Sequence, residues 1–122
     1  MTPVVFTVFG EPASKANSRK IVRHPGTQRP MVIKSQKARD YLRDFEKQCP
    51  VCDPPLEGEL AVTMTIYYAS RRPDLDESLI LDAMQGKIYV NDRQVREKHV
   101  FHGLDKDNPR TDIAVTHRES RD

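Results

Sequence analysis

A run of alternating residues, ELAVTMTIYYAS (59–70), restricts the fold more than any other part of the chain. Leu60, Val62, Met64, Ile66 and Tyr68 would lie on one side of an extended strand, with smaller or polar side chains mainly on the other. This period of two predicts a strand that has one face against a hydrophobic core. RRPD (71–74) follows directly and ends the strand in a charged loop.

The rest of the chain divides into short elements that are separated by turn-forming residues. We expect a first strand at 4–9, a hairpin made by KIVR (20–23) and MVIK (31–34), helices within 35–48 and 76–85, a hairpin made by KIYV (87–90) and QVREKHVFH (94–102), and a last strand at 111–117. Ser35 is a good N-cap for the first helix, and Gly86 closes the second. This order predicts one small α+β domain over residues 1–122, with a mixed, mostly antiparallel sheet and about two helices.

The charges are distributed unevenly, although the formal net charge is only +2. The first 39 residues contain a single acid, Glu11, and the following basic residues: Lys15, Arg19, Lys20, Arg23, Arg29, Lys34, Lys37 and Arg39. A basic surface that is separate from an acidic site suits a polyanionic ligand. Because no apolar run approaches the ~20 residues of a membrane span and no basic leader is present, we expect a cytoplasmic protein without a membrane partner.

The acids gather just after the arginines of the long strand. Asp74 and Asp76 precede the second helix, Glu77 and Asp82 lie within it, and Asp92 follows KIYV. Carboxylates two apart in an extended segment point the same way, and one or two carboxylates with waters and phosphate oxygens are the ligands Mg²⁺ prefers. An Asp before a helix or in a turn is often only a cap, so each acid alone also has a purely structural interpretation.

Metal-dependent hydrolysis of a phosphodiester requires this combination of groups. Carboxylates hold a metal that activates water, and a lysine can stabilise the charge that develops on the phosphate. Basic residues elsewhere neutralise the neighbouring phosphates. We therefore expect Mg²⁺, for which Mn²⁺ can substitute, as the cofactor and a polyanion with phosphodiester bonds rather than a small molecule as the substrate.

Three segments of the chain resemble the RusA family of Holliday junction resolvases, which are common in phages and prophages. They are GEPASKANSR (10–19), RRPDLDE (71–77) and LDAMQGKIYVNDRQV (81–95). The resemblance implies a homodimeric Mg²⁺-dependent endonuclease that resolves four-way DNA junctions by paired nicks in recombination and repair, in a bacterial or phage-infected cytoplasm. It also implies that Asp74, Asp76 and Asp92 are the catalytic carboxylates and that Asp82 matches an acid of the helix.

One departure from the family pattern concerns the residues after DLD. The family usually continues Asp-x-Asp-Asn-x-x-Lys, whereas Glu77 replaces the Asn here and Ile80 stands where the Lys would fall. Glu77 is therefore a candidate fourth metal ligand, and Lys87 a candidate catalytic lysine, with Lys15 and Lys20 as alternatives. A protein that binds junctions without cutting them, or a PD-(D/E)xK-type nuclease, remains an alternative interpretation.

Further residues are candidates for contacts with DNA or metal. The candidate DNA-binding residues lie in the first loop, the first hairpin and helix, and the arginine pair: Lys15, Asn17, Ser18, Arg19, Lys20, Lys34, Lys37, Arg71 and Arg72. Cys49 and Cys52 form C-x-x-C, and His99 and His102 form H-x-x-H. Their spacing is unlike that of common zinc sites, so zinc binding stays open.

Overall fold

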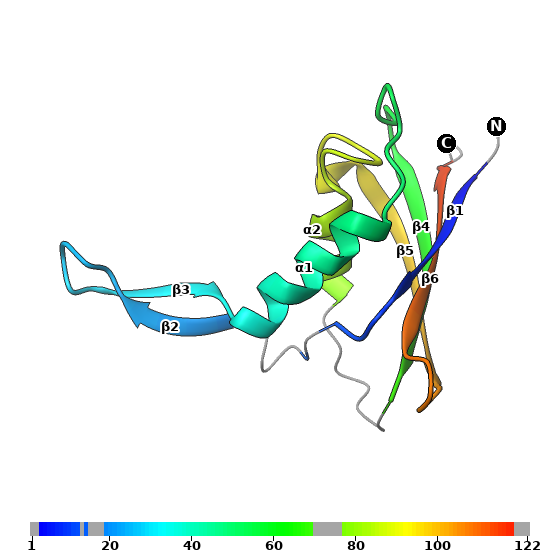
Figure 1. Ribbon diagram of the computed structural model, residues 1–122. Coiled ribbons are helices and arrows are strands. Elements are labelled where there is room, and N and C mark those ends of the chain that lie inside the picture. The colour runs from blue at the N-terminus through cyan, green and yellow to red at the C-terminus, as the bar shows by residue number, and fades with distance from the viewer. Residues whose placement is uncertain (1–2, 13, 15–18, 70–76, 119–122) are drawn as a thin grey trace.

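The computed structural model describes residues 3–12, 14, 19–69 and 77–118. The predicted fold class is confirmed: a four-stranded sheet carries both α-helices on one side, and a separate two-stranded ribbon extends away from it (Figure 1). The elements occupy the following ranges in chain order: β1 Val4–Phe9, β2 Arg19–Arg23, β3 Pro30–Lys34, α1 Gln36–Gln48, β4 Leu60–Tyr68, α2 Glu77–Met84, the 3₁₀ helix η2 Asp92–Gln94, β5 Val95–Leu104 and β6 Arg110–His117.

The main sheet has the strand order β1-β6-β4-β5. The β1–β6 and β6–β4 pairs are antiparallel, whereas β4 and β5 are parallel. A parallel neighbour requires a crossover connection. Here α2 and the residues up to η2 supply it, so the acidic segment lies within the connection between the two parallel strands.

The long strand predicted from alternation forms as expected. Leu60, Val62, Met64 and Ile66 of β4 are fully buried, and Tyr68 is half-buried. Phe45 of α1 packs on this core and meets the ring of Phe6 edge-on at a centroid distance of 6.2 Å. The alternating side chains of β4 therefore hold the sheet against the helices.

The predicted first helix and first hairpin are also confirmed. The side chain of Ser35 accepts a hydrogen bond from Ala38 N at 3.2 Å and so caps α1. β2 pairs with β3 in antiparallel register, with Ile21 opposite Val32. α2 ends at Met84 before Gly86, whose φ of 82° favours glycine.

The second predicted hairpin is wrong. Residues 87–90 form a turn after α2, in which only Tyr89 makes isolated bridges, to Leu56 and Gln85. β5 begins only at Val95 and pairs with β4. Ile88 and Tyr89 are apolar because they are fully buried, and a short apolar run has the same pattern in a buried turn as in a strand.

Candidate active site

The segment that carries the first two predicted catalytic acids starts at the end of β4. Asp74, Asp76, Arg71 and Arg72 lie outside the described residues, but the residues before them are well anchored. Ala69 N donates to Glu11 Oε2 at 2.7 Å, and Asp105 N donates to Tyr68 O at 3.0 Å. These two hydrogen bonds determine where the chain leaves the sheet.

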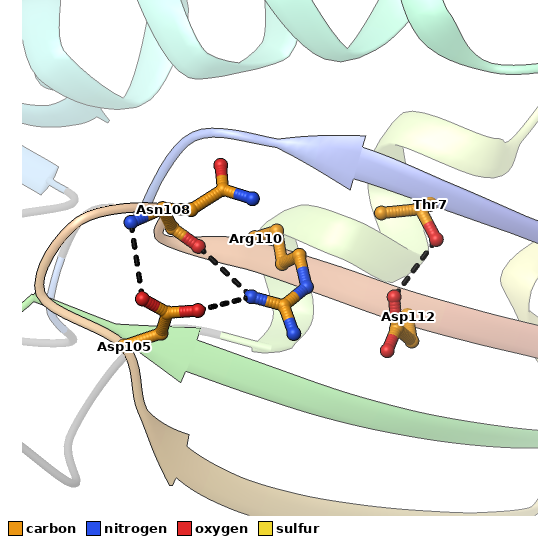
Figure 2. Close-up of polar contacts among 5 residues, drawn as sticks. All are labelled: Thr7, Asp105, Asn108, Arg110 and Asp112. Atoms are coloured by element: carbon orange, nitrogen blue, oxygen red, sulfur yellow. Dashed lines mark hydrogen bonds and ion pairs between the residues drawn. The ribbon is translucent and has the colours of Figure 1, made fainter.

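A polar cluster in the β5–β6 turn reinforces this end of β4 (Figure 2). Arg110 Nη1 donates to Asp105 Oδ2 at 2.7 Å and to Asn108 O at 3.1 Å, and its guanidinium lies 4.1 Å from the centre of the Tyr67 ring. The hydrogen bond from Arg110 is the main reason that the pKa of Asp105 is lowered. Asp105 therefore serves as a structural anchor of the turn.

A pocket of about 480 Å³ opens beside α2. It is lined by residues from β3, α1, α2 and the turn after α2: Lys34, Leu42, Glu46, Asp82, Ala83, Gln85 and Lys87. Asp82 and Lys87, both candidates from the sequence, therefore share one concave surface. Lys34, predicted only as a DNA contact, lies in the same pocket.

Two long ion pairs cross this pocket. Lys34 Nζ lies 4.0 Å from Asp82 Oδ2, and Lys87 Nζ lies 3.8 Å from Glu46 Oε1. All four side chains keep some contact with solvent. Because long, partly solvated pairs are weak, an incoming phosphate can compete for both lysines.

Asp92 lies at the start of η2, in a turn that is held by amide side chains. Asn91 and Gln94 form a capping box around it. The backbone N–H of Asp92 donates to Gln85 Oε1 at 3.0 Å, and Gln94 Nε2 donates to Leu56 O at 2.8 Å. Gln85, which also lines the pocket, thus connects the Asp92 turn to the end of α2.

The side chain of Tyr89, in the turn after α2, is fully buried. Its hydroxyl donates to Leu81 O at 2.6 Å. Burial raises the pKa of Tyr89, and the charges of Asp92, Asp82 and Cys49 raise it further. The hydroxyl therefore stays protonated and remains a donor to Leu81 O.

Sequence reasoning did not single out Glu46, Gln85, Tyr89 or Gln94. The spacing of Asn91 and Gln94 was a readable signal, since it is that of a capping box. The other three depend on tertiary contacts.

The family described as Endodeoxyribonuclease RusA matches residues 10–116, which is most of the chain. The chain belongs to the RusA family. Its members are endodeoxyribonucleases that resolve Holliday junctions, and this places the chain among hydrolases of DNA. A comparison with curated proteins finds no match.

Two residues that depart from the RusA pattern have clear positions. Ile80 is fully buried in the core and is not among the residues that line the pocket. Glu77 lies 3.8 Å from Lys98 Nζ on β5, whereas Asp82 faces Lys34 on β3. Glu77 and Asp82 thus point to different elements, and a metal role for Glu77 stays a prediction.

The candidate DNA-binding residues separate into two groups. Lys15, Asn17 and Ser18 lie outside the described residues. Arg19, Lys20 and Lys34 belong to the β2–β3 ribbon and Lys37 to the first turn of α1, so the described candidates lie on one continuous part of the chain.

The described residues contain no group of side chains that supports the zinc hypothesis. Among the residues that the structure describes, no three His, Cys, Asp or Glu side chains are grouped to hold a metal. His99 contacts Glu97 at 3.1 Å. Burial raises the pKa of the Cys49 thiol to about 11, so this cysteine stays protonated at neutral pH.

Across the described ranges, no helix has the length and apolar character needed to cross a membrane.

Proposed function

We propose that this RusA-family chain is a Mg²⁺-dependent, structure-selective nuclease that resolves four-way DNA junctions by paired nicks, acting as a homodimer in recombination and repair in a bacterial or phage-infected cytoplasm. The observation that carries the proposal is the pocket beside α2, which is lined by Asp82, Lys34 and Lys87 and which Gln85 connects to the turn of Asp92. We extend the site to Asp74 and Asp76, because their segment leads directly into α2.

The chemistry of the donor set fits a hard cation. Asp82 offers a carboxylate in the pocket, and Asp92 lies in the turn bonded to Gln85 of the same pocket; Mg²⁺ is commonly held by one or two carboxylates together with waters and phosphate oxygens. Asp74, Asp76 and Asp92 would hold the ion, with Asp82 and Glu77 as further candidate ligands. A bound Mg²⁺ would supply an activated water and neutralise negative charge on the phosphate.

The two pocket lysines would stabilise the charge that develops on the scissile phosphate. Lys87 was the candidate from the sequence, and Lys34 lies in the same pocket beside Asp82. Either lysine could replace the family lysine missing at Ile80. Lys87 lies in a turn rather than on a strand, which does not favour the PD-(D/E)xK interpretation.

The test is cleavage of a labelled four-way junction beside a linear duplex of the same sequence, with Mg²⁺ or chelator. We expect junction-selective nicking that requires Mg²⁺ and falls at least about 100-fold in Asp76→Asn and Asp92→Asn. Asp112→Asn is the matched control, since Asp112 bonds Thr7 Oγ1 on β1 (2.8 Å) and lies outside the pocket (Figure 2).

Metal binding has a separate readout. Mg²⁺ should raise the melting temperature of the wild type, because a ligand that binds only the folded state stabilises it, and less so in Asp92→Asn. Junction binding without nicking would identify a non-catalytic junction-binding protein. Equal cleavage of linear duplex would favour a PD-(D/E)xK-type nuclease instead.

A further inference from the structure

The β2–β3 ribbon extends away from the helices and the main sheet (Figure 1). Its strands pair from Arg19–Lys34 to Arg23–Pro30. Residues 19–34 include Arg19, Lys20, Arg23, Arg29 and Lys34 and no acid. An arm that carries only positive charges is repelled by basic surfaces and attracted to a polyanion.

The two faces of the ribbon differ in exposure. Side chains alternate along a strand, and directly paired residues share a face. One face carries Lys20, Val22, Met31 and Ile33, of which Val22 and Ile33 are half-buried. The other face, named here the outer face, consists of Arg19, Ile21, Arg23, Pro30, Val32 and Lys34.

On the outer face, two exposed apolar side chains lie between the basic residues Arg19, Arg23 and Lys34, named here the basic frame. Ile21 is 73% exposed and Val32 opposite it is 62% exposed. The next residues on this face are Arg19 and Lys34 toward the body of the protein and Arg23 toward the tip. Contiguous exposed apolar surface with a polar rim is a mark of interaction sites.

The outer face adjoins the candidate active site at Lys34. Lys34 shares this face with Val32, and its Nζ reaches Asp82 in the pocket. A DNA strand held at the pocket would therefore continue along the outer face. Duplex DNA offers the ribbon phosphates and groove edges, whereas a branch point additionally offers bases with an unstacked face.

We propose that the outer face of the ribbon reads the branch point of the DNA junction, with Ile21 and Val32 packed against unstacked bases and Arg19, Arg23 and Lys34 on the flanking phosphates. The proposal rests on the junction activity proposed above. Proteins that deform DNA use apolar side chains in this way, and a two-stranded ribbon is narrow enough to enter a groove. The apolar pair then contributes selectivity for structure, and the basic frame contributes affinity for any DNA.

The experiment uses the double variant Ile21→Ser/Val32→Ser. Because both side chains are exposed, folding should be retained. Val5→Ser/Val51→Ser is the matched control, since these valines are 67% and 66% exposed and lie on β1 and in the connector after α1. Binding is measured by fluorescence anisotropy in chelator, so that it does not depend on cleavage, with a junction that carries 2-aminopurine at the branch point.

We expect the ribbon variant to lose about tenfold or more in junction affinity, because burying two aliphatic side chains is worth at least that factor. Its affinity for linear duplex at the same salt should be unchanged. The wild type should raise the fluorescence of 2-aminopurine by unstacking the base at the branch point, and the ribbon variant should lose this rise. The control variant should match the wild type in all three measurements.

Two results for the ribbon variant would overturn the proposal directly: unchanged junction affinity and fluorescence, or an equal loss of affinity for duplex and junction. A third is conversion of a wild-type dimer to a monomer in the variant, which would make the outer face an interface between copies of the chain. A wild type without junction preference would instead contradict the proposed function.

Discussion

Tyr89 provides a direct measure of how the fold supports the candidate site. The last carbonyls of a helix have no partner within it. In α2, Asp82 O accepts from Gln85 N, Met84 O accepts from Ile88 N, and Leu81 O accepts from the Tyr89 hydroxyl at 2.6 Å. Tyr89 is fully buried, so Tyr89→Phe would remove this donor from the Leu81 carbonyl, which lies next to Asp82 in the chain and takes part in a partly buried hydrogen bond.

The cost follows from the asymmetry of buried hydrogen bonds. Leaving a buried carbonyl unsatisfied costs about 1–3 kcal/mol of unfolding free energy. For a domain of this size, this corresponds to a decrease of roughly 3–15 °C in melting temperature. The decrease should be seen by circular dichroism and in the midpoint of urea unfolding, with an unchanged slope.

Tyr41→Phe is the matched control, because it removes the same oxygen from another buried tyrosine. Across the described residues, neither Tyr41 Oη nor Thr111 Oγ1 has a hydrogen-bond partner. Burial raises the pKa of Tyr41, and the nearby Thr111 hydroxyl lowers it slightly, so the two hydroxyls are neighbours without good bond geometry. Tyr41→Phe should therefore be neutral or slightly stabilising. Equal losses in the two variants would refute the assignment of Tyr89 as the cap of α2.

Two further predictions concern titration. Arg110 lowers the pKa of Asp105, so the stability that this pair contributes is present above the ordinary pKa range of an aspartate and is lost as the pH falls through the lowered pKa. The unfolding free energy of Asp105→Asn should therefore depend less steeply on acid than that of the wild type. An unchanged acid profile would contradict this. Burial raises the pKa of Cys49 to about 11, so at pH 8 iodoacetamide should alkylate Cys52 well before Cys49. Because Lys87 lowers the pKa of Cys49, Lys87→Met should slow the alkylation of Cys49 further. Equal alkylation rates of the two cysteines in mass spectra would show that Cys49 is accessible as thiolate.

Elements that depend on local patterns were predictable from the sequence. The period-two alternation predicted β4, helical spacing behind a serine cap predicted α1, and turn residues between two short runs predicted the β2–β3 ribbon. Each signal is local, because the residues that carry it are neighbours in the chain.

The resemblance of residues 10–19, 71–77 and 81–95 to the RusA family was likewise readable from the sequence, and the family comparison confirms it. The acid motif carries the chemistry in residue types and spacings, so it can be read without coordinates. It did not indicate which lysine would lie beside which acid.

Only the tertiary structure decided the direction of β5 and the composition of the pocket. The residues before β5 read as a strand, but Ile88 and Tyr89 are buried in a turn, and α2 carries the chain across so that β5 runs parallel to β4. Lys34 meets Asp82 only because the end of β3 lies beside α2. Apolar periodicity reports burial but not the partner that buries a residue, and the partner is decided by packing between elements that are distant in the sequence.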